Sequence, residues 1–97
     1  MKSISISDLI NNYNNKPINL IDIRDSYNYN LGHIYNSRNI PMYSLICNPS
    51  KFLSINETYY IYCQSGNRSK NVVNKLNSLG YDTINVDGGY NLYLLMK

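Results

Sequence analysis

Residues 58–79 of this chain read T-Y-Y-I-Y-C-Q-S-G-N-R-S-K-N-V-V-N-K-L-N-S-L. Residues 58–63 are mostly β-branched and aromatic, which predicts a buried strand. In residues 69–79 the apolar side chains recur at helical spacing, and Gly80 follows as a stop signal, so this segment predicts a helix. A strand that passes through a short polar turn into a helix is typical of a βαβ unit.

Segments typical of strands and of helices alternate on both sides of this stretch. The further predicted strands are residues 18–24, 39–41 and 83–86. The further predicted helical segments are residues 7–13, capped by Ser7 and Asp8, 26–31, 42–53 with a break at Pro49, and 90–96. This alternation predicts an α/β fold, a parallel sheet with helices on both faces. With 97 residues, the chain is expected to form one domain over residues 1–97.

The composition argues against several classes of protein. The net charge is only +3 and the nine Lys and Arg residues are scattered, so we do not expect nucleic-acid binding. No apolar run approaches the roughly 18 residues of a membrane span, and the N-terminus lacks the apolar region of a signal peptide. Two cysteines and one histidine are too few for a disulfide framework, or for a four-ligand zinc site without carboxylates. We therefore expect a soluble, cytoplasmic protein that uses no metal.

The loop at residues 63–69 carries the most reactive side chain, Cys63. Ligands of parallel sheets bind at the carboxyl ends of the strands. Polar clusters at residues 22–25 and 87–89 also follow predicted strands, so the three should meet at one edge. The N–H groups of a tight loop and of the helix after it form an anion site, which lowers the pKa of a cysteine and favours the nucleophilic thiolate. The alternative is that Cys63 only ends a buried strand.

Side chains near Cys63 are the candidate binding residues. Gly66 permits a backbone conformation that a Cβ would penalise, and Arg68 adds a permanent cation. Arg24, at the end of a predicted strand, either binds an anionic substrate or pairs with Asp25. The predicted substrate-binding residues are Arg24, Gln64, Ser65, Gly66, Asn67, Arg68 and Ser69, around Cys63 as the catalytic residue.

Three blocks of the sequence form a set: L-I-D-I-R-D at residues 20–25, C-Q-S-G-N-R-S at 63–69 and D-G-G-Y at 87–90. Between the first two lie Tyr29, G-H-I at 32–34 and N-I-P at 39–41. In order and spacing they resemble the rhodanese family of thiosulfate sulfurtransferases, with its D-V-R-E…E-Y…G-H-I…N-I-P, C-x-x-G-x-R-S and E-G-G motifs. The resemblance implies a small five-stranded parallel sheet flanked by helices, and an activity that needs no cofactor.

The resemblance also implies a mechanism of sulfur transfer. The Cys63 thiolate would take the outer sulfur of thiosulfate, or of a persulfide donor, and become a persulfide. Cyanide, a thiol or a sulfur-relay protein would then accept that sulfur. Asp25, Asn28 and Asn36 stand where the family usually has Glu, Glu and Gly, and we expect these differences to affect the pocket rather than the fold.

Three further residues are expected to be structural. Asp22 is predicted to hold loop N–H groups or a turn, and His33 to lie in a structural turn rather than to act as a base. Cys47 follows Leu45 and Ile46, which predicts a small buried side chain. The alternative for Cys47 is a resolving role against Cys63.

Two other functions remain open. Some phosphatases and arsenate reductases use a C-x5-R loop, whereas Cys63 and Arg68 are spaced as C-x4-R, a smaller cradle that suits one sulfur atom. A persulfide carrier, or a sulfur-relay module bound to a partner, would use the same Cys63. An intact Cys63 argues against an inactive regulatory domain.

Overall fold

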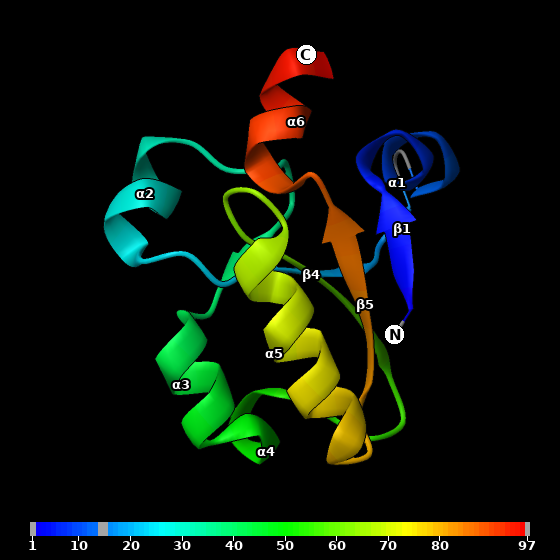
Figure 1. Ribbon diagram of the computed structural model, residues 1–97, viewed down its shortest axis with the longest axis vertical. Coiled ribbons are helices and arrows are strands. Elements are labelled where there is room, and N and C mark those ends of the chain that lie inside the picture. The colour runs from blue at the N-terminus through cyan, green and yellow to red at the C-terminus, as the bar shows by residue number, and fades with distance from the viewer. Residues whose placement is uncertain (1, 14–15, 97) are drawn as a thin grey trace.

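The structure is a computed structural model that describes residues 2–13 and 16–96. Strands and helices alternate along the chain (Figure 1). The strands are β1 (Ser3–Ser5), β2 (Asn19–Asp22), β3 (Arg38–Asn39), β4 (Thr58–Tyr62) and β5 (Asp82–Asp87). The helices are α1 (Ile6–Tyr13), α2 (Ser26–Leu31), α3 (Met42–Cys47), α4 (Pro49–Phe52), α5 (Asn67–Ser78) and α6 (Gly89–Met96). None of the helices in the described ranges is long and apolar enough to cross a membrane.

All strand pairs in the five-stranded sheet are parallel, and the strand order is β1-β5-β4-β2-β3. The predicted α/β fold is therefore confirmed. β1 is the element that the sequence did not predict, because a strand of three residues is too short to show an alternating pattern. The start of α1 also differs from the prediction: the Ser5 hydroxyl accepts a hydrogen bond from the Asp8 N–H (3.0 Å), so Ser5 caps the helix in place of Ser7 and Asp8.

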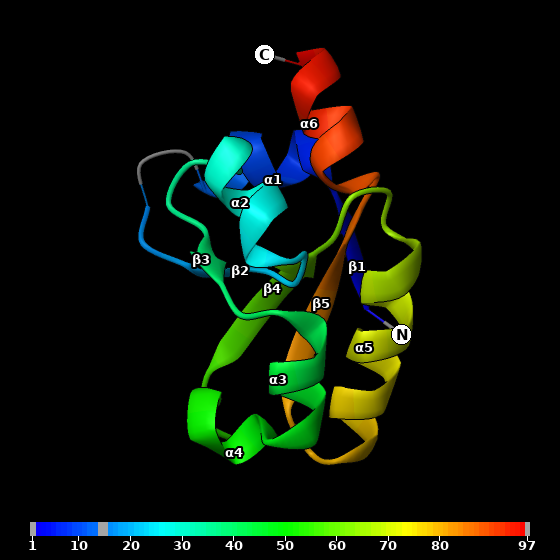
Figure 2. The same ribbon diagram turned by 90° about the vertical axis from the view of Figure 1, so that its left-hand side faces the viewer.

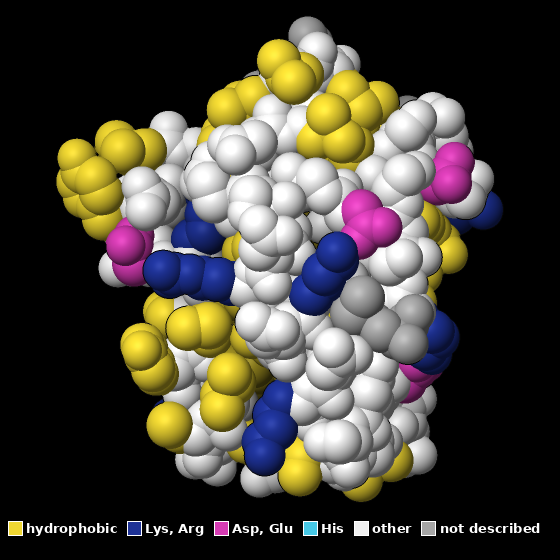
Figure 3. Space-filling model, viewed as in Figure 1, with side chains coloured by type: hydrophobic (Ala, Val, Ile, Leu, Met, Phe, Trp, Pro, Cys, Tyr) yellow, Lys and Arg dark blue, Asp and Glu magenta, His cyan; other side chains and the backbone are white. Residues whose placement is uncertain are grey.

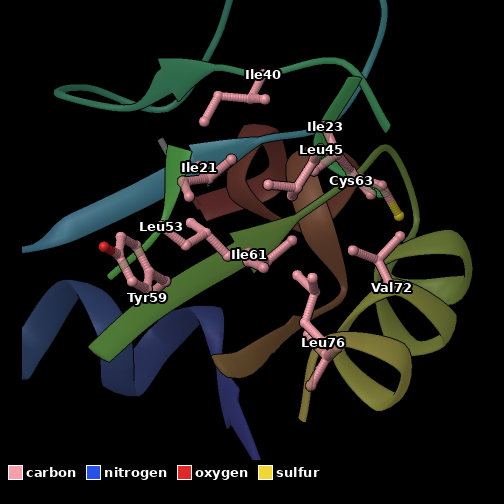
Figure 4. Close-up of a cluster of buried hydrophobic side chains, with 11 residues drawn as sticks. Ile21, Ile23, Ile40, Leu45, Leu53, Tyr59, Ile61, Cys63, Val72 and Leu76 are labelled. Atoms are coloured by element: carbon pink, nitrogen blue, oxygen red, sulfur yellow. The ribbon is translucent and has the colours of Figure 1, made fainter. Parts of the chain in front are cut away.

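The side chains of β4 alternate between the two faces of the sheet, and this alternation places Cys63. Tyr60 and Tyr62 pack against α1 and α6, whereas Tyr59, Ile61 and Cys63 join the cluster formed with α3, α4 and α5. Figure 4 shows the Cys63 sulfur at the margin of this cluster, next to α5. Cys63 thus lies where a buried strand ends and faces the helix that its own loop begins.

Cys47 is exposed, so the prediction that it is a buried apolar residue was wrong. Leu45 of α3 is fully buried, and a residue two positions further along a helix lies on nearly the opposite side. The apolar neighbours in sequence therefore turn toward the core while Cys47 turns away from it. The predicted break at Pro49 is confirmed, because α3 ends and α4 begins there.

Figure 2 shows the molecule from the side, with α6 at the opposite end from α3 and α4. On the face that Figure 3 shows, the described Lys and Arg side chains do not form one continuous patch. On that face the basic side chains are therefore scattered, as the sequence predicted.

Candidate active site

The Cys63 side chain sits inside a turn of its own loop. The Sγ atom accepts hydrogen bonds from the backbone N–H groups of Gly66 (3.1 Å) and Ser69 (3.3 Å). The Ser69 hydroxyl lies 3.4 Å from the sulfur and donates to the Gly66 carbonyl oxygen (3.1 Å). Helix α5 begins at Asn67, two residues earlier than predicted, so the N–H groups that face the sulfur belong to the end of the loop and the first turn of the helix.

Gly66 makes this turn possible. Its φ is +98°, in the region that favours glycine, as the sequence predicted. A Cβ at this position would also lie only 3.0 Å from the backbone nitrogen of Gly88, which follows β5. The loop is therefore compact because it lacks a side chain at Gly66.

These contacts lower the pKa of the Cys63 thiol below its ordinary value. Burial raises the pKa, but hydrogen bonds from the Ser69 hydroxyl and from the N–H groups of Ser69, Gly66 and Ser65 lower it by more. The thiol is only 4% exposed, so the donors act with little competition from water. A lowered pKa favours the thiolate, which is the form of cysteine that acts as a nucleophile.

Cys63 lines a cavity of about 460 Å³. Of the predicted site residues, Cys63, Arg24, Gln64 and Arg68 line it, and the rest of its wall is Ile23, Asp25, Asn28, Pro41, Met42 and Tyr43. The predicted residues Ser65, Gly66, Asn67 and Ser69 do not line the cavity. The backbone N–H groups of Gly66 and Ser69 donate to the Cys63 sulfur, and the Asn67 N–H donates to the Ser65 hydroxyl within the same loop. The sequence did not identify Met42 and Tyr43, although they directly follow a predicted strand and so belong to the same sheet edge.

Arg24 pairs with Asp22 and not with Asp25, which corrects one of the two roles predicted for it. Its Nη2 group donates to Asp22 Oδ2 (2.7 Å) and to the Gly32 carbonyl oxygen (2.7 Å). Its Nη1 group donates to Gln64 Oε1 (3.0 Å). Burial lowers the pKa of the guanidinium, but the hydrogen bond and charge of Asp22 raise it by more, so Arg24 stays protonated.

Asp22 and His33 make structural contacts, whereas Arg68 lies at the cavity wall. Asp22 is fully buried and also accepts a hydrogen bond from the Arg24 N–H (2.9 Å), which confirms its predicted role in a turn. His33 stacks on Tyr29 with ring centroids 3.8 Å apart, its Nδ1 lies 2.8 Å from the Tyr29 carbonyl oxygen, and it does not line the cavity. Arg68 is exposed in the first turn of α5, at the cavity wall.

Comparison with known proteins identifies the family of this fold and loop. The sequence profile of the rhodanese-like domain matches residues 5–95. The chain belongs to the rhodanese-like family. The resemblance seen in the three sequence blocks is thereby confirmed.

Several solved structures are similar to this rhodanese-like domain. A rhodanese-like domain protein from Staphylococcus aureus is 39% identical, with a TM-score of 0.83 over 94% of this chain and 89% of that one. SSP1007 from Staphylococcus saprophyticus is 36% identical, with a TM-score of 0.86 over 96% of this chain and 93% of that one. The human single-domain sulfurtransferase TSTD1 shares the fold at 23% identity, with a TM-score of 0.80 over 100% of this chain and 98% of that one. No curated protein sequence matches this chain.

The three departures from the family pattern fall in two places. Asp25 and Asn28 line the cavity beside Cys63, as expected of residues that affect the pocket. Asn36 does not line this cavity. It lines a second cavity on the other face of the sheet, between α1 and α6. Its φ is +68°, and asparagine tolerates this left-handed conformation better than other non-glycine residues, which explains how it replaces a glycine.

Proposed function

We propose that this rhodanese-like domain is a sulfurtransferase that moves sulfane sulfur from thiosulfate or a persulfide donor to cyanide or a thiol. The observation that carries the proposal is the convergence of the Gly66 and Ser69 N–H groups on the Cys63 sulfur beside an open cavity. A cytoplasmic location, where reduced thiols are available as acceptors, is part of this proposal.

In the first step the Cys63 thiolate attacks the outer sulfur of thiosulfate. A new S–S bond forms, the S–S bond of thiosulfate breaks, and sulfite leaves with the electron pair, so the enzyme holds a cysteine persulfide. In the second step cyanide or a thiolate attacks the terminal sulfur, and Cys63 leaves as a thiolate. Atoms and electrons balance over the two steps without a metal or another cofactor.

The loop supplies the electrostatic stabilisation for both steps. The Ser69 hydroxyl donates to the Gly66 carbonyl oxygen and lies 3.4 Å from the sulfur, so it is within reach of a thiolate at Cys63. The N–H groups of the loop remain in place for the thiolate and for the sulfur atoms of the persulfide. No reorganisation of the backbone is needed when negative charge returns to the cysteine.

The cavity wall is suited to an anionic donor. Arg68 is the exposed cation at the wall, and we propose that it binds the charged end of the donor. The charge of Arg24 is paired with the buried Asp22 carboxylate, and most of its N–H groups already bond to Asp22, Gly32 and Gln64. We therefore assign direct contact with the donor to Arg68 and not to Arg24.

The second candidate function is that of a persulfide carrier that passes sulfur to a protein partner. It is favoured by Tyr43, which lines the cavity and yet is 77% exposed, so a partner could contact it directly. A phosphatase or an arsenate reductase is less consistent with the site, because Cys63 and Arg68 are spaced as C-x4-R and not as the C-x5-R of those enzymes.

A panel of donors and acceptors tests the proposal. Wild-type protein, Cys63→Ser and the matched control Cys47→Ser are assayed with thiosulfate and low-molecular-weight persulfides as donors, and with cyanide and thiols as acceptors. We expect multiple turnovers in the wild type and in Cys47→Ser, and none in Cys63→Ser. Loading of sulfur without turnover on any small acceptor would favour the carrier, and activity in Cys63→Ser would contradict the proposal.

A further inference from the structure

The first turn of α6 contacts the active-site loop through backbone hydrogen bonds. The Tyr90 N–H donates to the Cys63 carbonyl oxygen (3.0 Å), and the Asn91 N–H donates to the Gln64 carbonyl oxygen (2.9 Å). Both N–H groups belong to the start of a helix, where no partner exists within the helix itself. Figures 1 and 2 show the loop between β4 and α5 directly beside the base of α6. Two consecutive loop carbonyls are thus held by a helix from the other end of the sequence.

The direction of these carbonyls determines where the next N–H groups point. In a trans peptide unit the C=O and the N–H point in opposite directions. Because α6 holds the Gln64 carbonyl, the N–H of Ser65 must point away from α6. The next N–H along the loop, that of Gly66, donates to the Cys63 sulfur (3.1 Å). The bond from Asn91 therefore holds the peptide unit that directly precedes the Gly66 N–H donor.

Two further contacts fix this arrangement. A Cβ at Gly89 would overlap the Cys63 carbonyl oxygen, so glycine is what allows α6 to approach so closely. The side chain of Gln64 is held from both ends: its Nε2 group donates to Asn91 Oδ1 (2.6 Å), and its Oε1 atom accepts from Arg24 (3.0 Å). Asn91 thus binds Gln64 twice, once by its backbone and once by its side chain.

We infer that Asn91 is a positioning residue for Cys63: it holds the peptide unit between Gln64 and Ser65 in the orientation from which the following Gly66 N–H reaches the thiolate. Asn91 is exposed and does not line the cavity, so it acts through the loop and not on the substrate. The consequence for sulfur transfer rests on the proposed function, but the consequence for the thiol does not.

The test compares Asn91→Pro with Asn91→Ala in a Cys47→Ser background, so that Cys63 is the only thiol. Proline removes the backbone donor and the side chain, whereas alanine removes only the side chain. The pH dependence of alkylation by iodoacetamide measures the thiolate, and thermal melting measures the fold. Asn71→Ala, an exposed residue of the same type on α5, is the matched control.

We expect Asn91→Pro to shift the alkylation profile to higher pH, with a rate about tenfold lower at any pH below the midpoint. Asn91→Ala should show roughly a threefold decrease, and Asn71→Ala none. A folded Asn91→Pro with an unshifted profile overturns the inference. If the proline variant does not fold, the alanine variant decides: a shift without a change in melting supports the inference, and no shift overturns it.

The alkylation readout also separates this inference from the proposed function. If the wild type takes no sulfur from any donor but the Asn91 variants still shift the profile, the proposed function fails and the positioning role stands. If the wild type transfers sulfur and the variants leave the profile unchanged, the proposed function stands and the positioning role fails.

Discussion

Replacement of Ser69 by alanine tests how the loop activates Cys63. Ser69 is fully buried, and its hydroxyl is 3.4 Å from the Cys63 sulfur and 3.1 Å from the Gly66 carbonyl oxygen. The alanine variant keeps the backbone N–H of residue 69, and it loses only the hydroxyl. We expect the thiolate to lose about 1 kcal/mol of stabilisation, which corresponds to roughly a fivefold change in the thiol–thiolate equilibrium.

The sign of this effect follows from the cause of the lowered pKa. Hydrogen bonds lower the pKa of Cys63 against the opposing effect of burial, so removing one of them must raise the pKa. The assay is the pH dependence of alkylation of Cys63 in a Cys47→Ser background, with the midpoint of Ser69→Ala expected above that of the unsubstituted protein. Steady-state sulfur transfer at a pH below the midpoint should fall in parallel.

The same helix offers a matched control. The Ser78 hydroxyl donates to the Lys75 carbonyl oxygen three residues earlier (2.6 Å), as Ser69 does to Gly66, but no described contact joins it to Cys63. Ser78→Ala therefore reproduces the loss of a helix hydroxyl without the loss of a thiolate donor. If Ser69→Ala keeps the unsubstituted midpoint, or if Ser78→Ala shifts it equally, the hydroxyl does not stabilise the thiolate and our reasoning is wrong.

Three other predictions follow from the site. Arg68→Ala should raise the KM for anionic donors by about tenfold or more, with a stability change within ~0.5 kcal/mol; unchanged kinetics with a large loss of melting temperature would make it a structural residue. Asp22→Ala leaves a buried guanidinium unpaired and should lower the free energy of unfolding by about 3–5 kcal/mol in denaturant titrations, against about 1 kcal/mol for the helix-capping Asp25→Ala. Insertion of one residue between Ser65 and Gly66 should reduce the rate of sulfur transfer on the order of 10²–10³-fold, because the N–H donors no longer converge on one sulfur; a rate that survives would remove the size of the loop as a ground for preferring a transferase to a phosphatase.

The loop around Cys63 could be predicted because its geometry is local in sequence. A strand of alternating side chains, a glycine three residues after the cysteine and a helix start determine where the thiol and the N–H groups lie. The convergence of the three polar clusters at one edge was predictable for a related reason, since the carboxyl ends of parallel strands meet there. The contacts from Arg24 to Gln64 and from Tyr90 to Cys63 confirm it.

The wrong sequence predictions concern features that depend on which face of a helix a residue occupies, or on contacts with distant parts of the chain. Cys47 looks buried from its neighbours in sequence, but the phase of α3 turns it outward. Asp22 and Arg24 are two residues apart at the end of a strand, where residues at this spacing point to the same side. This spacing could have predicted that Arg24 pairs with Asp22 and not with Asp25. The role of Asn91 has no comparable signal, because only the tertiary packing of α6 brings it to the loop.

The central claim is that Cys63 carries the transferred sulfur, and mass spectrometry tests it most directly. The intact protein is treated with thiosulfate, freed of excess donor, weighed, and digested for peptide mapping under conditions that preserve persulfides. We predict a gain of one sulfur atom, located on Cys63 and lost on addition of cyanide. A sulfur atom on Cys47 instead, or no gain with thiosulfate or with any persulfide donor, would contradict the account.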